Sequence, residues 1–335
     1  MIIGCIFCKY HYGDERRGLS LEYLGMYPAL KELGHDVRVL WIDDLLADHT
    51  VLQRRVLDFV EREQPQMVFF MLMDKEIDIK TLDAVRDKAS TVNWFCDDAW
   101  RFDSFSRQLA PHFTYAITTN KFALKRYRDM GYQNVVHCQW AAFQIQPDIE
   151  FYSQQYEYDI SFIGMKSAYR AWFLGQLRRR GYAVGCFGHG WDGGALSTDD
   201  MARIIRRSRI NLNVSNSICY DVRCLLSNWK AARRFIGAAL SPHKKTADTV
   251  KARVFEIPAC GGFELAHYVP GIEDYYVIGQ ELAAYTALDD LLRQIDYYLE
   301  HEPLRQQIAE RGYQRTLRDH LYSKRLKHFF ETIAA

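Results

Sequence analysis

The sequence predicts an α/β protein built from two doubly wound parallel sheets, and three observations lead to this prediction. Strand-like apolar segments alternate with helix-like segments along most of the 335 residues, a pattern typical of parallel sheets with helices on both faces. A chain of this length exceeds the roughly 250–300 residues at which single cores stop growing. The alternation lapses once, at residues 141–158. Two domains are therefore expected, joined near this stretch.

The N-terminal part is expected to contain six strands with helices between them. Its strands are short apolar runs at residues 1–8, 37–41, 67–72, 91–96, 115–119 and 134–138. Helices are predicted at residues 19–33, 51–63, 78–88 and 121–130. Gly34 follows the first of these helices, and glycine readily adopts the positive φ that is common just after a helix.

The C-terminal part repeats the alternation and then ends in helices. Strands are expected at residues 159–164, 182–187, 210–215 and 263–268, and helices at 169–180, 199–209 and 252–259. From Leu288 onward three helical segments are predicted, with breaks at Pro303 and near Gly312. The predicted division of the chain is residues 1–150, residues 151–318 and a last helix at 319–335.

Charge and composition narrow the classes of protein. Lys and Arg total 43 against 42 Asp and Glu, so no global field attracts nucleic acid or an anionic membrane, and any polyanion would need a local cluster of cations. The apolar residues 1–8 are followed at once by Lys9, too soon for a secretory signal or a membrane span. The 8 Cys are scattered, as reduced thiols in a cytoplasm are. We expect a soluble, cytoplasmic protein that binds no nucleic acid.

The segment at residues 251–265 combines charged residues with glycines, and it reads KARVFEIPACGGFEL. Arg253 and Glu256 share a face near the start of a predicted helix, where backbone N–H groups and the helix dipole favour an anion such as a diphosphate. Glu256 could accept hydrogen bonds from ribose hydroxyls, and Gly261 and Gly262 would let the backbone approach a ligand. Taken alone, the segment is better explained by an exposed Arg–Glu pair and a glycine turn.

A second basic element follows the first strand of the C-terminal part. Gly164, Lys166 and Arg170 span the connection from this strand to the next helix. Ligands of open α/β sheets bind at the carboxyl ends of the strands, so these cations are expected to face the same crevice as Arg253. A solvated basic helix start explains the two cations equally well.

Seven segments, spread over nearly the whole chain, carry a family resemblance. They read LEYLGMYPALKELGHDV (21–37), VNWFCDDAWRFD (92–103), YDISFIG (158–164), FGHGWDGG (187–194), INLNVSNS (210–217), KARVFEIPACGGFEL (251–265) and LRQQIAERGYQRTLRDH (304–320). Together they resemble the CgeB-like (spore-maturation type) glycosyltransferases, relatives of the retaining glycosyltransferase group 1 family. The resemblance implies the GT-B architecture, in which two Rossmann-like domains face each other across a cleft and the last helix returns to the N-terminal domain. It also implies a hexosyltransferase that uses a nucleotide diphosphate sugar and needs no metal or other cofactor.

The resemblance also assigns residues to the sugar donor. The wider family has an E-x7-E pattern, whose second acid binds the ribose and whose first lies near the transferred sugar. Here the pattern reads Asp248-x7-Glu256 and lacks the usual GFG between the acids, so the role of Asp248 and the retaining stereochemistry stay open. Arg253 is expected to stabilise the leaving diphosphate. The predicted donor-binding residues are Gly164, Lys166, Arg170, Ser215, Asn216, Asp248, Lys251, Arg253, Glu256, Gly261 and Gly262.

Acidic residues after the fourth predicted strand are candidates for the acceptor side. Asp98, with Asp97 beside it, would face the cleft where an acceptor hydroxyl loses its proton, and it is the second candidate catalytic residue. A helix cap for residues 99–109 explains Asp98 at least as well. The two acids could also bind a metal, but adjacent strand residues point to opposite faces. Arg17 and Glu22, near the first loop, are further acceptor-side candidates, with ordinary loop solvation as the preferred alternative.

Two other features have competing explanations. The string Gly188-x-Gly190-x-x-Gly193 matches the dinucleotide fingerprint, but no helix starts there and no ribose-binding acid follows at the required distance. A turn near the base of the donor is the preferred interpretation. The insertion at residues 218–250 contains an apolar stripe with a basic flank, which suits a membrane surface or an acceptor. Packing on its own domain or on a second subunit is favoured instead.

The leading functional hypothesis is transfer of a glycosyl group from a nucleotide diphosphate sugar to a hydroxyl acceptor. One alternative is a nucleotide-sugar epimerase of the same architecture, which would change its sugar without an acceptor. The other is a non-catalytic nucleotide-binding protein of surface assembly, which would bind nucleotide without turnover.

Overall fold

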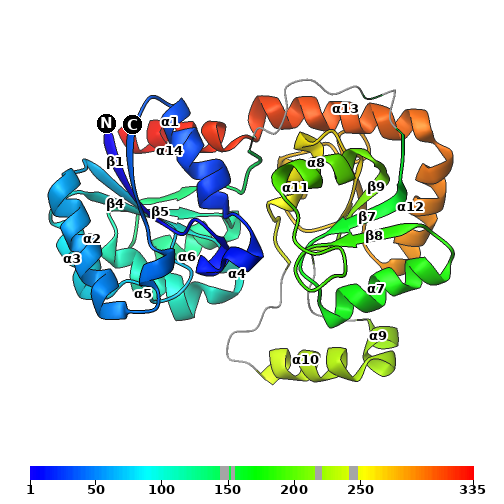
Figure 1. Cartoon of the computed structure of the whole chain (residues 1–335), viewed down its shortest axis with the longest axis horizontal. Helices are drawn as coiled ribbons and strands as arrows, with labels where there is room; N and C mark the ends of the chain where they lie inside the picture. Colours follow the sequence, from blue (N-terminus) through cyan, green and yellow to red (C-terminus); the bar gives the residue numbers. More distant parts are fainter. Residues whose placement is uncertain (144–150, 152–154, 216–220, 241–247) are drawn as a thin grey trace. The chain divides into compact units, whose positions relative to one another are not determined.

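The computed structural model describes residues 1–335 except 144–150, 152–154, 216–220 and 241–247 (Figure 1). The chain divides into two compact units. The first consists of Met1–Trp140 together with Tyr322–Ala335, and the second of Ala141–Leu321. Each unit contains its own sheet with helices on both sides of it (Figure 1).

The sheet of the first unit has six strands in the order β2-β1-β3-β4-β5-β6. All neighbouring strands in it are parallel. The strands are β1 (Ile2–Phe7), β2 (Asp36–Trp41), β3 (Met67–Phe70), β4 (Ser90–Phe95), β5 (Tyr115–Thr118) and β6 (Val135–His137). The six predicted strand segments of this part of the chain therefore all form strands, and β3 and β4 are buried almost throughout, as expected for central strands covered on both faces.

The helices of the first unit include the C-terminal one. They are α1 (Tyr27–Glu32), α2 (His49–Glu63), α3 (Ile79–Arg86), α4 (Asp98–Arg101), α5 (Arg107–Leu109), α6 (Leu124–Asp129) and α14 (Tyr322–Ala334). The predicted first helix begins with a π-helical segment, Glu22–Met26, instead of a regular turn. Gly25 in this segment faces the ring of Tyr322, and a Cβ there would lie 2.4 Å from the ring. Glycine thus lets α14 pack closely on this unit.

The sheet of the second unit has five parallel strands in the order β11-β10-β9-β7-β8. They are β7 (Tyr158–Ile163), β8 (Val184–Phe187), β9 (Ser208–Asn213), β10 (Glu264–His267) and β11 (Ala283–Tyr285). Counted from its own first strand, this sheet has the order 2-1-3-4-5, which is also the order of the first five strands of the other unit. Such sheets bind ligands at the carboxyl ends of the first and third strands, where the strand order reverses.

The helices of the second unit are α7 (Ala168–Arg179), α8 (Thr198–Arg206), α9 (Val222–Ser227), α10 (Trp229–Leu240), α11 (Arg253–Ala259), α12 (Leu288–Glu300) and α13 (Glu302–Asp319). The predicted break near Gly312 is wrong, because α13 runs through this residue. Gly312 lies against the carbonyl of Glu281, which a Cβ would approach to 2.3 Å. The glycine therefore permits close packing, and the helix continues to Asp319. The short strand β11 was not predicted.

The predicted fold class, α/β with two doubly wound parallel sheets, is confirmed. The core of the second unit joins residues of β7, β9 and β10 to α7, α12 and α13. In the part of the chain that the structure describes, no helix combines the length and the apolar character needed to cross a membrane.

Candidate functional site

The switch point of the second sheet lies between β7 and β9, and the side chain of Arg170 connects the two strand ends there. One guanidinium nitrogen donates to the carbonyl of Met165, which follows β7, at 3.0 Å. Another donates to the carbonyl of Val214, which follows β9, at 2.8 Å. Burial lowers the pKa of Arg170 to about 10; Arg253 lowers it further and Asp248 opposes the shift. Arg170 is therefore a positioned, mostly buried cation at the edge where ligands of this fold bind.

Lys166 lies in the connection between β7 and α7, and its ammonium group is exposed. The nitrogen is 5.1 Å from the ring centre of Trp191, and the backbone N–H donates to the carbonyl of His189 at 2.9 Å. The turn that contains Trp191 packs directly on this connection. Gly188 has a φ of 110°, and a Cβ there would lie 2.6 Å from the carbonyl oxygen of Gly164. The glycines of the apparent dinucleotide fingerprint thus serve close packing between two loops.

Three buried polar atoms at the carboxyl edge of this sheet have no hydrogen-bond partner among the described residues. They are Nε of Arg170, Oγ of Ser215 and Nδ1 of His267. Arg170 reaches the ends of β7 and β9, Ser215 follows β9, and His267 ends the adjacent β10. Most buried polar groups in folded proteins are hydrogen-bonded. Three atoms without a hydrogen bond on neighbouring strand ends therefore indicate a place where a polar ligand could supply the missing hydrogen bonds.

Asp248 lies beside His267, with 3.8 Å between a carboxylate oxygen and Nδ1. Burial lowers the pKa of His267, and the charge of Asp248 acts in the opposite direction. The His267 ring is also 5.5 Å from the ring of Tyr285. The structure thus brings Asp248 to the carboxyl end of β10. Sequence reasoning missed His267, although a histidine at the end of an apolar strand is a recognisable signal.

Arg253 and Glu256 form an ion pair of 2.9 Å at the start of α11. The sequence taken alone favoured an exposed Arg–Glu pair, but the two side chains are only 25% and 7% exposed. Arg253 also donates to the sulfur of Met201 in α8. The remaining residues of α11 are buried, from Val254 to Ala259. Lys251, just before α11, is half-buried.

Glu264 is a second buried acid near this pair, and sequence reasoning did not single it out. One carboxyl oxygen accepts a hydrogen bond from the amide of Asn213 at 2.8 Å. Burial raises the pKa of Glu264 well above its ordinary value; Arg253 opposes this shift and Glu256 adds to it. The sequence contains a signal for this residue, a glutamate inside an apolar strand, because such a glutamate is rarely buried unless it is paired.

The placement of Gly261 and Gly262 corrects one prediction. Both residues lie between the C-terminal end of α11 and the start of β10, which is the amino edge of the sheet. Gly261 adopts a φ of 76°, and a Cβ on Gly262 would lie 2.4 Å from Ile205 and 2.6 Å from Asn211. The glycines thus end a helix and allow close packing at the edge opposite to the unpaired groups. Asn216, another predicted residue, lies outside the described residues.

The corresponding edge of the first sheet carries buried acids. Glu22 is 6% exposed. Asp43 follows β2 and accepts hydrogen bonds from the backbone N–H groups of Lys9 and Tyr10 at 2.7 and 2.9 Å. Burial raises the pKa of Glu22 to about 7, and the charges of Asp43 and Glu76 act in the same direction. The carboxyl group of Glu22 therefore changes its protonation state near neutral pH.

Arg17 and Asp97, two further predicted acceptor-side residues, both lie near Tyr12. The guanidinium of Arg17 is 5.2 Å from the ring centre of Tyr12. Burial raises the pKa of Tyr12, Asp97 raises it further, and Arg17 opposes the shift. Tyr12 belongs to the loop after β1, whereas Asp97 follows β4. The fold thus brings Arg17 and Asp97 to the same edge of the first sheet.

Asp98 lies in the packed interior of the first unit, where it is 1% exposed. Its carboxylate accepts hydrogen bonds from the hydroxyls of Thr118 in β5 and Tyr127 in α6. Burial raises the pKa of Asp98 to about 6, while hydrogen bonds from Ser106, Thr118 and Tyr127 oppose the shift. The prediction that Asp98 faces an acceptor is corrected, because its carboxylate joins α4, β5 and α6 within the core. Asp98 is the first residue of α4 and does not hold the N-cap position, which belongs to Asp97.

Replacing Asp98 by asparagine is expected to flatten the pH dependence of stability. The pKa of this carboxyl group rises from 3.8 to about 6 on folding, so the folded protein binds the proton more tightly. This contribution to the free energy of unfolding is complete below about pH 4 and is lost as the pH rises through about 6, about 3 kcal/mol in all. Chemical denaturation across this range should show a shallower slope for Asp98→Asn. Parallel profiles for variant and parent would contradict the assignment.

Among the described residues, no group of three or more His, Cys, Asp or Glu side chains has an arrangement that could hold a metal ion. Asp97 and Asp98, the predicted alternative metal pair, differ in their surroundings. Asp97 is half-buried near Tyr12, whereas Asp98 is enclosed by the core.

Comparison with known proteins defines the class of fold. The family model described as "Glycosyl transferase-like" matches residues 170–331, just under half of the chain. No curated protein matches the sequence. Among the solved structures that resemble the chain is sucrose-phosphate synthase from Thermosynechococcus elongatus, with a TM-score of 0.60 and 8% identity over 99% of this chain. HepE from Anabaena in complex with UDP-glucose has a TM-score of 0.57 and 10% identity over 100% of this chain. A putative UDP-N-acetylglucosamine 2-epimerase from Listeria monocytogenes has a TM-score of 0.56 and 10% identity over 99% of this chain.

The chain covers 98%, 99% and 96% of these three structures, respectively. At such low identity the likeness shows the fold alone, which is that of the GT-B glycosyltransferases. The sequence from α7 to α14 is, in addition, glycosyltransferase-like.

Proposed function

We propose that this protein transfers a hexosyl group from a nucleotide diphosphate sugar to a hydroxyl acceptor without a metal ion. The observation that carries the proposal is the set of three unpaired polar atoms, on Arg170, Ser215 and His267, at the carboxyl edge of the second sheet. The glycosyltransferase-like sequence of this unit supports it. So does the similarity in fold to a protein solved with UDP-glucose.

The donor diphosphate is assigned to the switch point between β7 and β9. Lys166 offers an exposed ammonium group there, and Arg170 keeps its Nε unpaired. Negative charge on the diphosphate grows as the glycosidic bond breaks, so fixed cations stabilise the transition state more than the bound donor. Arg253 is close enough for its charge to act on Arg170 and adds to the same field. Cations held by the protein would replace the metal ion in this step.

The sugar and ribose are assigned to the neighbouring residues. Asp248 and His267 lie together at the end of β10, and Ser215 follows the neighbouring strand β9. These side chains can bind hydroxyl groups. Glu256 is the ribose-binding candidate, and its ion pair with Arg253 holds it at the start of α11. The related pattern has glutamate where this chain has Asp248. Product analysis therefore decides whether the transfer retains or inverts the configuration of the sugar. The CgeB-like subtype is part of this proposal.

The acceptor hydroxyl is assigned to the corresponding edge of the first sheet, with Glu22 as the group that takes its proton. Glu22 replaces Asp98 in this role, because Asp98 is bound within the core. A general base works best when its pKa is near the working pH, and that of Glu22 is about 7. Arg17 and Asp97 lie at the same edge and can bind other parts of the acceptor.

Replacing Lys166 by alanine should weaken the binding of the cognate nucleoside diphosphate by about tenfold or more, the effect of losing one charged hydrogen bond. Calorimetric titration with UDP, GDP and dTDP, in the presence of EDTA, identifies the nucleotide and measures the loss. Arg179→Ala is the matched control, because Arg179 is an exposed cation at the other end of α7. Equal affinity in both variants, or binding that EDTA abolishes, would refute the assignment.

A nucleotide-sugar epimerase is the second candidate, because the fold also resembles a putative epimerase. Product analysis separates the two functions. Incubating the protein with the identified donor and a panel of hydroxyl acceptors should release nucleoside diphosphate only when an acceptor is present. An epimerised sugar formed without an acceptor would decide for the second candidate. Nucleotide binding without any turnover would indicate a non-catalytic surface-assembly protein.

A further inference from the structure

Helix α10 exposes three large apolar side chains. Trp229, Ile236 and Leu240 are seven and four residues apart, which places them along one face of the helix. They are 70%, 56% and 80% exposed. Ala231, on the opposite side of the helix, belongs to the core of the second unit. The helix therefore packs Ala231 inward and presents an apolar stripe to its surroundings.

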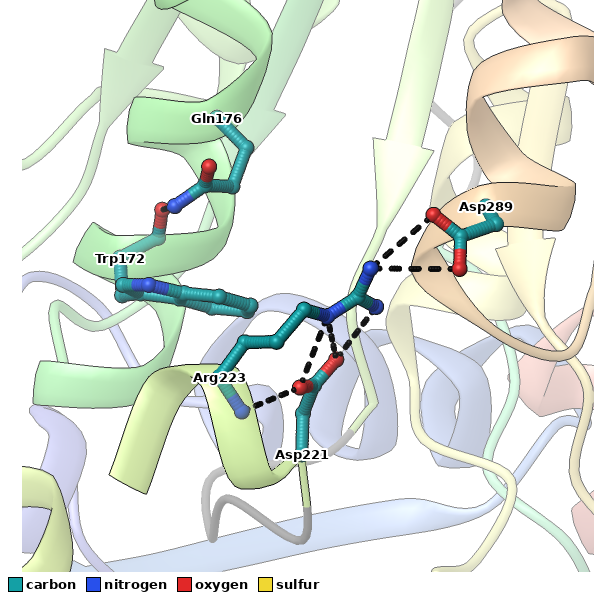
Figure 2. Close-up of polar contacts among 5 residues, drawn as sticks. All are labelled: Trp172, Gln176, Asp221, Arg223 and Asp289. Carbon is teal, nitrogen blue, oxygen red and sulfur yellow. Dashed lines mark hydrogen bonds and ion pairs between the residues drawn. The ribbon is translucent and has the colours of Figure 1, made fainter. Parts of the chain in front are cut away.

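This orientation is held by contacts of the adjoining helix α9. Figure 2 shows the guanidinium of Arg223 between the carboxylates of Asp221, just before α9, and Asp289, in α12. The shortest of these contacts are 2.8 Å to Asp221 and 3.1 Å to Asp289. Cys224 of α9 is buried in the same core as Ala231, and α10 also contacts α7. The outward stripe is thus a feature of a packed helix pair.

The charges of α10 are all positive. Lys230, Arg233 and Arg234 are its charged residues, and the helix contains no acid. The guanidinium of Arg233 is 5.8 Å from the ring centre of Trp229, at the stripe itself. Lys244 and Lys245 follow in the sequence. Because the net charge of the whole chain is only +1, this is the kind of local cluster that a polyanion would require.

We propose that α10 is an interfacial helix that binds the surface of an anionic lipid membrane. An apolar stripe beside cations, with tryptophan among the apolar residues, is the pattern of helices that lie in the plane of a membrane surface. The stripe enters the boundary between headgroups and acyl chains. The long side chains of Lys230 and Arg233 extend to the lipid phosphates. This proposal does not depend on the proposed sugar transfer.

The charge of α10 favours a lipid surface over a second copy of the chain. A symmetric dimer places the same patch of both copies in contact. Such a dimer would bring Arg233 and its neighbouring cations against their own copies, and like charges at close range repel. An anionic membrane would bury the apolar stripe and also attract the cations.

Vesicle sedimentation tests the proposal. The 335-residue chain is mixed with vesicles of phosphatidylcholine alone, or of phosphatidylcholine containing phosphatidylglycerol. It should bind the anionic vesicles about tenfold more strongly or better, and added salt should weaken the binding. Two variants should each lose most of it: the triple variant Trp229→Ser, Ile236→Ser, Leu240→Ser, and the charge-reversal variant Lys230→Glu, Arg233→Glu.

Two matched controls separate α10 from general surface effects. The variant Val277→Ser, Ile278→Ser removes exposed apolar side chains elsewhere in the same unit, and Arg179→Glu, Arg180→Glu reverses two cations at the end of α7. Both should bind anionic vesicles like the parent. Sedimentation equilibrium without lipid gives the oligomeric state of parent and triple variant. Equal binding to neutral and anionic vesicles, or no binding to either, would overturn the proposal. So would α10 variants that bind anionic vesicles like the parent, or a dimer that the triple variant abolishes.

Discussion

Replacing Arg253 by alanine is expected to lower the free energy of unfolding by about 3–5 kcal/mol, the cost typical of breaking a buried ion pair. The variant would leave Glu256, whose side chain is 7% exposed, without the cation at 2.9 Å. Chemical denaturation at neutral pH measures the loss. Arg253 was expected only to stabilise the leaving diphosphate, but the structure also pairs this cation with a buried acid.

A double-mutant cycle gives this prediction its control. Removing both partners, in Arg253→Ala with Glu256→Ala, should be less harmful than the sum of the single changes, because no unpaired buried charge remains. The apolar pair Arg253→Met with Glu256→Leu should unfold at nearly the parental free energy. Additive single effects would show that the ion pair contributes little. In that case, turnover of Arg253→Ala would again measure its effect on the diphosphate.

Replacing Glu22 by glutamine is expected to lower turnover at least a hundredfold, within the range for the loss of a general base. Glutamine keeps the shape of the protonated carboxyl group, which burial already favours at Glu22, so the fold should remain intact. In the parent, turnover should rise with pH through about 7, as the carboxyl group loses its proton. This rise should be absent from the residual activity of the variant. The initial rate of nucleoside diphosphate release, followed against pH, measures both effects.

Asp98→Asn is the matched control for Glu22→Gln. Both residues are buried acids of the first unit with raised pKa values, but one carboxylate oxygen of Asp98 accepts hydrogen bonds from Thr118 and Tyr127 within the core. The Asp98 variant should therefore keep its turnover and change only the pH profile of stability. Turnover lost in the Asp98 variant and retained in the Glu22 variant would return the catalytic role to Asp98.

Part of the candidate site follows from local spacing. Arg253 and Glu256 pair because residues three apart on a helix are neighbours, and the structure shows their contact. Gly164, Lys166 and Arg170 lie at the carboxyl edge because they follow a strand of a parallel sheet. The same reasoning would have excluded Gly261 and Gly262, since a glycine pair between a helix and the next strand lies at the amino edge. The information was present in the chain order.

Other residues could not be placed from the sequence. Asp97 and Asp98 are adjacent, yet one is half-buried near Tyr12 and the other is enclosed by hydroxyl groups of β5 and α6. Arg170 was expected to be available to a ligand, but two of its nitrogens donate to the carbonyls of Met165 and Val214. The hydrogen bonds of Asp98 with Thr118 and Tyr127, and that of Arg170 with Val214, join residues 20 to 44 positions apart. Local periodicity in the sequence does not predict such contacts.

The sequence by itself determined the fold class, the alternation of strands and helices, and the set of residues that follow each strand. These properties depend on apolar periodicity and on chain order, which are local. The tertiary structure decided which acids are buried, which cations already have partners, and which face of α10 is exposed. Burial and pairing depend on which elements pack together, and packing is set by contacts between residues far apart in the chain.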